Sequence, residues 1–390
     1  MDLSSLTITN IRAVEVREVP FSVGLVPPWN PKRRITTRDY VVVRVDTNAG
    51  VSSVALDGDY TPGLPARAED VKALIAPRLV GQPVMAMESH TAVLHEARPH
   101  GRFFFIALAL WDVIGRAVGM PLYKLWGGAR DKVKVYASTV QHGRSPEARA
   151  QDCIRFLEQG YRAVKLRLSA ETIEADIALV AACRDAVGDK MDLMVDANQA
   201  GKAPGSNAPG VHWDLDRAQE TARLLGVLDV AYLEEPLPYI LEQEGVRLRE
   251  RSPIPIAGGE GKVGVRAFGD LIQRGVYDII QPDPVVGGTP TDMLKIRAIA
   301  EGTDLPVVYH HGKSGLGFMI GLHLAAAFGR SPWLEYMDDG PFWQPEGFQV
   351  GFREVVPVDG DGYVHCPTGP GLGVAWDQDW LASIGLGRLE

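Results

Sequence analysis

The sequence predicts an α/β fold, a modified (β/α)7β TIM barrel preceded by an α+β domain, from three observations. The chain has 390 residues, enough for two domains or for one enlarged barrel. From residue 131 on, short β-rich runs alternate with segments of helical periodicity, as in parallel βαβ units. Before residue 130 the pattern is mixed. A doubly wound open sheet is the alternative, but no GxGxxG sequence follows the first parallel run.

The first domain is expected to span residues 1–130. Ile8–Val19 and Tyr40–Thr47 alternate apolar and polar residues, which is typical of antiparallel strands. The stretch between them, residues 20–38, is rich in Pro, Gly and charge, and we interpret it as a functional loop. Helical patterns follow at Ala68–Ile75 and at Phe105–Val118, and the apolar start of the second pattern is expected in the core.

The barrel is expected to span residues 131–345. The eight strand-like runs are residues 133–138, 163–169, 191–198, 230–236, 253–260, 277–284, 305–311 and 333–338. The intervening segments have helix signals, such as Ser145-Pro146 at a start and Gly160 at a stop. Residues 201–210 interrupt the repeat and are expected to form a loop near the mouth of the site. Residues 346–390 are rich in Gly and Pro and are expected to return to the first domain.

Composition excludes several classes of function. Hydrophobic residues make up 46% and charged residues 23% of the chain, as in ordinary globular proteins. A formal charge of −9 gives no basic surface for nucleic acid or for anionic lipid. The longest apolar run, Phe103–Trp111, is about half of what a membrane span needs.

The cysteines and the first residues predict a cytoplasmic protein. Cys153, Cys183 and Cys366 are far apart in the sequence, and none belongs to a CxxC pair. Residues 1–10 lack the basic and apolar regions of a secretory signal. Reduced, buried thiols are therefore expected.

The active site of such a barrel lies at the carboxyl ends of its strands. The polar residues at the ends of the second to eighth predicted strands are Lys165 and Arg167, Asp196 and Asn198, Glu234 and Glu235, Glu260, Asp283, His310 and His311, and Glu335. Most recur at intervals of about one βα repeat, so we expect them to converge on one axis. Any single acid among them is more often a solvated loop residue, but such a succession is not expected from surface composition.

Three carboxylates on adjacent strands, Asp196, Glu234 and Glu260, form a set of hard oxygen donors without Cys or His. Such donors suit Mg²⁺, which keeps positions for water or substrate oxygens. Zinc is disfavoured because the nearest nitrogen donors lie across the barrel.

Motifs along nearly the whole chain resemble the mandelate racemase subgroup of the enolase superfamily. They are ALWDVIGRAVGMPLYKLWGG from Ala109, Lys165-x-Arg167, VDAN ending at Asn198, LEEP around Glu234, GGE at Glu260, QPDP around Asp283, HHGKSGLG from His310, LEYMD at Glu335 and PGLGV from Pro370. The resemblance implies that residues 1–130 form a capping domain whose loops select the substrate. It also implies that Asp196, Glu234 and Glu260 bind Mg²⁺, and that relatives assemble as homo-oligomers.

The resemblance further implies that Asp283 and His310 form a base dyad and that Glu335 contacts the substrate carboxylate. This agrees with the chemistry of the residue types. His310 can accept a proton near pH 7, Asp283 can orient and stabilise its ring, and Lys165 can offset negative charge on a bound acid. A divalent cation and hydrogen-bond donors stabilise the enediolate formed when a carboxylate loses its α-proton.

The main departure from the subgroup is on the second strand, and a minor one is the Gly287-Gly288 pair close after Asp283. Racemases of the subgroup carry Lys-x-Lys on the second strand, whereas this chain has Arg167, a poor proton acceptor. With one good base, we expect a dehydratase that converts a sugar acid to a 2-keto-3-deoxy acid. The alternatives are a racemase or epimerase of a 2-hydroxy acid and a non-catalytic carbohydrate-binding relative.

Substrate contacts are expected from Asn198, His311 and Arg33. His311 follows His310 directly, and adjacent strand residues face opposite ways, so it either points away or contacts the substrate at the loosened strand end. Arg33 lies in the triplet Lys32–Arg34, which is either a solvated surface or a contact to an anionic substrate. His212 is expected on a loop surface.

Overall fold

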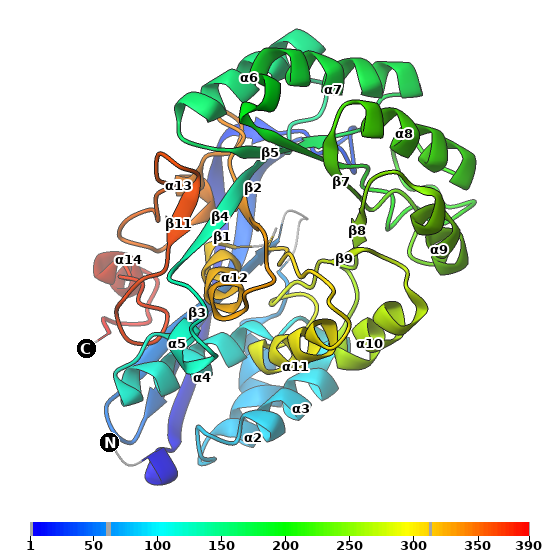
Figure 1. The fold of residues 1–390 in the computed structure, drawn as a ribbon. Coiled ribbons are helices and arrows are strands. Elements are labelled where there is room, and N and C mark those ends of the chain that lie inside the picture. The colour runs from blue at the N-terminus through cyan, green and yellow to red at the C-terminus, as the bar shows by residue number, and fades with distance from the viewer. Residues whose placement is uncertain (1–2, 60–63, 312–313, 390) are drawn as a thin grey trace.

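Two sheets organise the chain, a three-stranded antiparallel sheet and a parallel barrel sheet (Figure 1). The structure is a computed structural model, which describes residues 3–59, 64–311 and 314–389. Gly312 and Lys313, in the motif that begins at His310, lie outside the described residues. The predicted fold class, a modified barrel with an α+β N-terminal domain, is confirmed.

The N-terminal domain combines the antiparallel sheet with helices. It contains β1 (Ile8–Leu25), β2 (Ile35–Thr47), β3 (Ser52–Asp59), α1 (Ala68–Asp70), α2 (Ala76–Leu79), α3 (Met87–Ala97), α4 (Phe105–Val118) and α5 (Leu122–Leu125). The strand order is β1-β2-β3. A π-helical turn, Val71–Ile75, joins α1 to α2. Helix α4 agrees with its prediction, and Gly119 ends it with φ of 72°.

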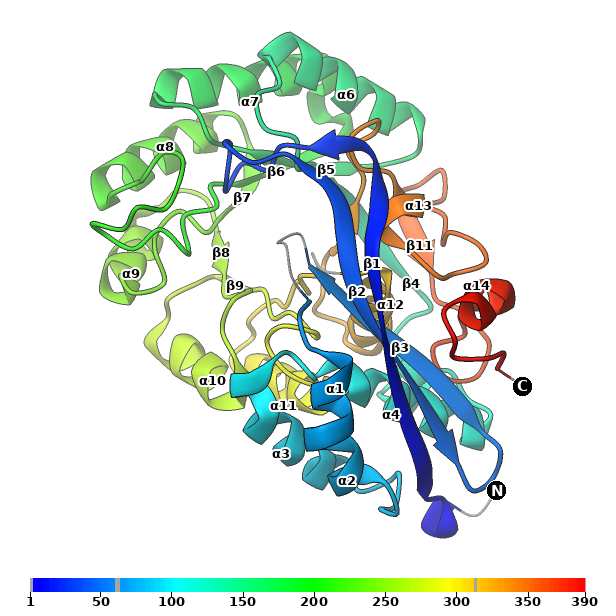
Figure 2. The same ribbon diagram turned by 180° about the vertical axis from the view of Figure 1, so that it is seen from behind.

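The loop expected at residues 20–38 is shorter than predicted. Strand β1 continues to Leu25 and β2 begins at Ile35, and these two residues pair across the hairpin. Pro20 is tolerated because β1 is an edge strand, where a missing N–H breaks no ladder. Only residues 26–34 remain irregular. They form the loop that joins β1 to β2, the two long blue strands in Figure 2.

The barrel sheet has the strand order β10-β4-β5-β6-β7-β8-β9. Its strands are β4 (Lys132–Ser138), β5 (Ala163–Arg167), β6 (Asp192–Asp196), β7 (Val230–Glu234), β8 (Ile256–Gly258), β9 (Ile279–Ile280) and β10 (Leu334–Met337). Its helices are α6 (Pro146–Glu158), α7 (Ile173–Val187), α8 (Leu215–Val227), α9 (Glu242–Arg251), α10 (Gly264–Arg274), α11 (Pro290–Glu301) and α12 (Gly315–Ala327). The first five of these helices lie outside the curved sheet in Figure 1.

The seventh predicted strand run, residues 305–311, is reduced to a parallel bridge between Ile280 and Val307. The backbone pairing nevertheless continues beyond it, because the N–H of His310 donates to the carbonyl of Pro282 at 3.2 Å. His310 is therefore held beside the end of β9 although no regular strand carries it.

The remaining elements follow the barrel. They are α13 (Pro345–Phe348), β11 (Tyr363–His365), which pairs with β4, and α14 (Gln378–Ser383). The chain then contacts the N-terminal domain, where the carboxylate of Asp112 accepts a hydrogen bond from the N–H of Leu372 at 2.6 Å. Arg44 of β2 donates to the carbonyl oxygens of Leu386 and Arg388.

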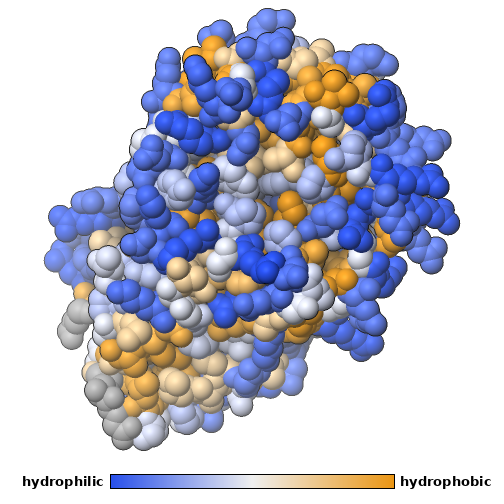
Figure 3. Space-filling model, viewed as in Figure 1, coloured by the Kyte–Doolittle hydropathy of each residue, from blue (hydrophilic) through white to orange (hydrophobic). Residues whose placement is uncertain are grey.

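Apolar burial follows the predicted pattern in the centre of the molecule. Phe103, Phe104 and Phe105 are fully buried, as predicted for the start of α4, and α12 is buried on every side. The face seen in Figure 3 is mainly hydrophilic, with apolar residues gathered toward its lower left. No helix in the described part of the chain combines the length and the apolar character needed to cross a membrane.

Candidate active site

Strand register brings the predicted strand-end residues together. Arg167 pairs with Asp196 across β5 and β6, and Asp196 pairs with Glu234 across β6 and β7. Residues in register on parallel strands point to the same side of a sheet. Side chains that are far apart in the sequence therefore meet inside the barrel.

Lys165 lies at the centre of the buried carboxylates. Its Nζ is 2.8 Å from both carboxylate oxygens of Glu234 and 3.0 Å from Oε1 of Glu335. Burial opposes the charge of Lys165, but these two carboxylates raise its pKa above the usual value. Burial raises the pKa of Glu234 to about 7, an effect that Lys165 only partly offsets.

Arg167, two residues after Lys165 on β5, contacts groups from other segments of the chain. Its guanidinium is ion-paired with Asp196 and donates to Oδ1 of Asn198 at 3.3 Å, to the Thr139 carbonyl at 2.6 Å and to Oγ of Ser138 at 3.1 Å. Burial opposes the charge, yet the carboxylate of Asp196 raises the pKa of Arg167 further. The side chain stays protonated and is fixed in place.

His310 lies between carboxylates. Its Nδ1 is 2.8 Å from Oδ2 of Asp283, and its Nε2 is 3.0 Å from Oε2 of Glu260 and 3.8 Å from Oε2 of Glu335. Burial alone would lower the pKa of His310, but the neighbouring carboxylates raise it well above the usual value. Asp283 is held from behind, because its Oδ1 accepts hydrogen bonds from the N–H groups of Val285 and Val286.

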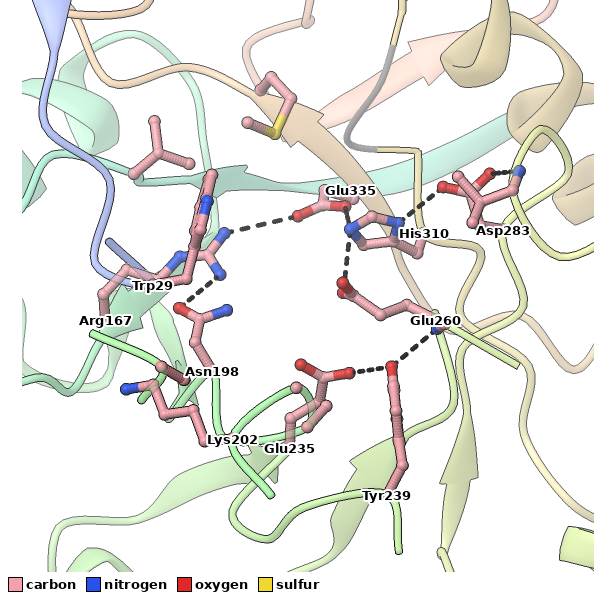
Figure 4. Close-up of a pocket in the computed structure, with 17 residues that line it drawn as sticks. Trp29, Arg167, Asn198, Lys202, Glu235, Tyr239, Glu260, Asp283, His310 and Glu335 are labelled. Atoms are coloured by element: carbon pink, nitrogen blue, oxygen red, sulfur yellow. Dashed lines mark hydrogen bonds and ion pairs between the residues drawn. The ribbon is translucent and has the colours of Figure 1, made fainter. Parts of the chain in front are cut away.

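A cavity of about 450 Å³ opens over these residues (Figure 4). Of the predicted site residues, those that line it are Arg167, Asn198, Glu260, Asp283, His310 and Glu335. Lys165, Asp196 and Glu234 lie beneath its wall and are fully buried. In Figure 4, His310 and Glu260 face Arg167 and Asn198 across the cavity, and Glu335 lies between the two sides, with its Oε1 4.0 Å from Nη2 of Arg167.

Three positions singled out in the sequence lie elsewhere. The His311 ring is buried against Phe318 and Phe348, and its Nε2 contacts the backbone carbonyl of Glu335. Arg33 is half-buried and does not line the cavity. His212 is exposed, and its Nε2 lies 2.8 Å from the Ala208 carbonyl oxygen.

Sequence reasoning missed four polar or aromatic residues at the site. Trp29 of the hairpin loop, Lys202 and Tyr239 line the cavity, and Gln281 donates to Glu234 at 2.7 Å. Gln281 could have been found, because it is the first residue of the QPDP motif and lies two positions before Asp283. The loop residues Trp29 and Lys202 carry no periodic signal.

Glu235 lies at a predicted strand end, and the sequence assigns it no role. It lines the cavity and accepts a hydrogen bond from the Tyr239 hydroxyl at 2.5 Å, and that hydroxyl accepts one from the N–H of Gly261. Burial raises the pKa of Glu235 well above its usual value, and the charge of Glu260 adds to the rise. Its backbone φ of 46° is rare for a residue with a side chain and is typical of functional sites.

The donor set at the site has the chemistry that Mg²⁺ requires. Carboxylates outnumber cations, since Asp196, Glu234, Glu235, Glu260, Asp283 and Glu335 gather around Lys165, Arg167 and His310. Each predicted metal ligand contacts a cation here: Arg167 at Asp196, Lys165 at Glu234 and His310 at Glu260. Within the described ranges, no three His, Cys, Asp or Glu side chains are arranged closely enough to hold one ion. The oxygen donors and the excess negative charge fit the cation, whereas the present side-chain contacts would have to change to admit it.

Comparison with known proteins identifies the family. Residues 14–127 match the mandelate racemase / muconate lactonizing enzyme N-terminal domain, and residues 148–380 match the enolase C-terminal domain-like family. The chain therefore belongs to the mandelate racemase / muconate lactonizing enzyme family of the enolase superfamily.

Several relatives act on sugar acids. The chain is 29% identical to arabinonate dehydratase of Saccharolobus solfataricus over 68% of its own length and 67% of the relative's. It is 31% identical to D-gluconate dehydratase of Thermoproteus tenax over 70% of its length, but this spans only 54% of that relative. Its fold matches the crystal structure of L-talarate dehydratase from Polaromonas sp. JS666, complexed with Mg and L-glucarate, with a TM-score of 0.81 and 27% identity, covering 97% of each chain.

Proposed function

We propose that this protein is a Mg²⁺-dependent dehydratase of a sugar acid. The observation that carries the proposal is the asymmetry of the cavity. His310, oriented by Asp283, forms one wall, whereas the facing wall presents Arg167, whose guanidinium is engaged by Asp196 and Asn198. A single good base suits one-sided proton abstraction followed by loss of a β-hydroxyl.

Asp196, Glu234 and Glu260 would hold the Mg²⁺ ion. When bound, the ion supplies positive charge that stabilises an enediolate oxygen. Glu260 lines the cavity, and the other two acids lie at the neighbouring strand ends beneath it. The similar L-talarate dehydratase structure contains Mg, which supports the proposed ion, and the choice of these three ligands rests on their carboxylate oxygens and their places at adjacent strand ends.

His310 would take the proton next to the substrate carboxylate at Nε2, the ring atom that faces Glu260 and Glu335. Asp283 holds Nδ1 in its protonated form, so that Nε2 is the acceptor whenever the ring is neutral. The same nitrogen can then return its proton to the departing hydroxyl group. Lys165 would offset the charge of the bound acid.

Glu335 would act at the reacting end of the substrate. It accepts a hydrogen bond from Oγ of Ser138 at 2.6 Å and lies 3.0 Å from Nζ of Lys165. Burial opposes its ionisation, but Lys165 and His310 lower the pKa of Glu335 well below its usual value. An ionised carboxylate accepts hydrogen bonds and repels a second carboxylate, so Glu335 would accept one from a substrate hydroxyl instead of contacting the substrate carboxylate as the resemblance implies.

The alternative of a racemase or epimerase has one observation in its favour. Lys202 lines the cavity on the side of Arg167, and burial lowers the pKa of its ammonium. A second base on that side would permit inversion at C2 of a 2-hydroxy acid.

Proton NMR in D₂O with Mg²⁺ and a panel of sugar acids distinguishes the two reactions. The dehydratase proposal predicts a 2-keto-3-deoxy acid and loss of the C2 proton from one face only. The alternative predicts a mixture of C2 configurations without keto acid, and that result would contradict the proposal. His310→Asn should abolish keto-acid formation, and His212→Asn, at an exposed histidine, is the matched control.

A further inference from the structure

Lys202 is a buried cation at the end of the cavity away from His310. It belongs to the loop of residues 201–210, and only 5% of its surface is exposed. In Figure 4 it lies beside Asn198 and Arg167, across the cavity from His310 and Glu260. It is therefore placed at the distal end of any acid whose α-carbon lies beside His310.

Lys202 differs from Arg167 and Lys165 in its partners. Its Nζ donates to the Val211 carbonyl oxygen at 2.7 Å, and among the described residues no carboxylate lies within ion-pair distance of it. Arg167 is paired with Asp196 and Lys165 with Glu234. An ammonium group carries three donors, so Lys202 keeps positive charge and hydrogen-bonding capacity for a ligand.

The surroundings of Lys202 destabilise its charged form, so an anion bound beside it would be stabilising. Burial lowers its pKa and the guanidinium of Arg217 lowers it further, while the more distant carboxylate of Asp196 offsets part of this effect. Burial lowers the pKa of His142, whose ring is half-buried, and the positive charge of Lys202 lowers it further. A desolvated charge without a counterion is costly, and an anion brought by the ligand would offset that cost.

The position of Lys202 is defined by two loops. A Cβ atom at Gly210 would lie 3.3 Å from Nζ of Lys202 and 3.5 Å from Cδ of Pro31 in the β1–β2 hairpin loop. Gly210 has φ of 86°, which disfavours other residues there. The ammonium thus lies at the edge of the cavity, where the barrel loop and the hairpin loop meet.

We propose that Lys202 binds a second carboxylate at the distal end of the substrate, so that the site selects sugar diacids over the matching monoacids. This inference rests on the proposed function, which places the reacting carboxylate at the other end of the cavity. A volume of about 450 Å³ is in the range that holds a small organic ligand. A fixed buried cation favours a ligand anion over a hydroxyl at the same place.

Isothermal titration calorimetry with Mg²⁺ tests the inference on two matched pairs, galactarate with galactonate and D-glucarate with D-gluconate. The His310→Asn chain prevents turnover during the titration. The diacid should bind about 30-fold more tightly than its monoacid in at least one pair, about 2 kcal/mol at 1.4 kcal/mol per tenfold. Adding Lys202→Met should bring the two affinities to within about threefold, and Lys202→Arg should keep most of the preference because it keeps the charge.

The controls separate a binding role from other roles. Lys190→Met removes an exposed lysine and should leave the preference unchanged. Thermal unfolding checks that Lys202→Met still folds, and Lys202→Gln, which also removes the charge, serves as the second variant if it does not. Equal affinity for diacid and monoacid in the parent chain, or a preference that survives Lys202→Met, overturns the inference.

Two further outcomes distinguish this inference from the proposed function. If the diacid preference depends on Lys202 but the wild-type chain forms no keto acid from any diacid, the inference stands and the dehydratase proposal fails. If Lys202→Met abolishes C2 exchange in D₂O, Lys202→Arg does not restore it and the binding preference is unchanged, Lys202 acts as a base. That result overturns the diacid assignment.

Discussion

Asp283 orients His310 through one carboxylate oxygen while its other oxygen is bound by the backbone. Oδ2 lies 2.8 Å from Nδ1 of His310, and Oδ1 accepts the N–H groups of Val285 at 2.7 Å and Val286 at 2.8 Å. The carboxylate therefore cannot rotate without losing two hydrogen bonds. Its orientation determines which ring nitrogen of His310 is free to take a proton.

Asp283→Asn is expected to inactivate the enzyme through the wrong histidine tautomer. The amide oxygen must replace Oδ1, because only an acceptor satisfies the two N–H groups, and the amide NH₂ then faces Nδ1 of His310. The proton moves to Nε2, which can no longer act as a base. We expect kcat for keto-acid formation to fall about 10³- to 10⁴-fold, as for the comparable change in a serine protease triad. Substrate affinity should change by less than about threefold. A rise in KM with kcat unchanged would contradict this account.

Chelation is expected to abolish turnover, and Mg²⁺ is expected to restore it. Asp196→Asn and Glu260→Gln should each weaken Mg²⁺ binding at least about 100-fold, because each removes a charged oxygen donor. Calorimetric titration with Mg²⁺ alone measures this without turnover. Glu220→Gln, at an exposed acid paired with Arg223, is the control and should bind Mg²⁺ normally. Full activity in metal-free protein would refute the ligand assignment.

Arg167→Met should destabilise the folded chain more than Arg167→Lys. Without the guanidinium, the fully buried carboxylate of Asp196 loses its strongest partner and keeps Asn198 and the more distant ammonium of Lys165, at 3.9 Å. Breaking a buried pair in this way costs about 3–5 kcal/mol. Lysine keeps the charge but cannot reach Ser138, Thr139 and Asn198 together. We therefore expect Arg167→Lys to lower the free energy of unfolding by about half as much as Arg167→Met. The midpoint of urea unfolding in metal-free buffer measures both, and equal midpoints would show that Arg167 is not a structural connector.

His323 is expected to make stability depend on pH. The N–H of Tyr123 donates to its Nδ1 at 3.1 Å, so the ring is neutral and its Nε2–H donates to the Leu372 carbonyl at 3.0 Å. Burial lowers the pKa of His323 to about 4. Below an unfolded-state value of about 6.5 the unfolded chain binds a proton that the folded chain does not. This contribution is complete above about pH 6.5 and is lost as the pH falls toward 4.

The expected size is about 2–3 kcal/mol between pH 7.5 and pH 4.5. It is measured as the difference in unfolding free energy between the wild type and His323→Gln at the two pH values. His212→Gln, at an exposed histidine, should show no such difference. A stabilising contribution of His323 that grows as the pH falls would contradict the expected direction.

The barrel and its strand-end residues could be predicted because parallel strands repeat regularly. Each short run of β-forming residues ends in a polar side chain, and register then brings Arg167, Asp196 and Glu234 together. The strand β3 was missed because the prediction followed alternation, whereas Ser52 to Gly58 are buried on both faces under α4. Alternation also could not decide whether His311 faces the substrate or points away from it. In the structure its ring lies in the aromatic core rather than in the cavity.

The distal end of the cavity could not be predicted in the same way. Trp29 and Lys202 come from irregular loops, and their places depend on how those loops pack on each other. Arg33 was expected at the substrate because of its charge, but the loop directs Trp29 to the cavity instead. Charge in a loop indicates solvent as readily as ligand.

The close approach of Gly210 and Pro31 has a consequence for attempts to change what this protein accepts. The two loops belong to different domains, yet each limits where the other can lie. A chimera that receives residues 201–212 from a relative but keeps its own residues 26–34 would either open a gap or create a clash above Lys202. Exchange of the two loops as a pair is the smallest transplant that preserves their packing beside the cavity, so new selectivity is expected to arise from paired changes rather than from single ones.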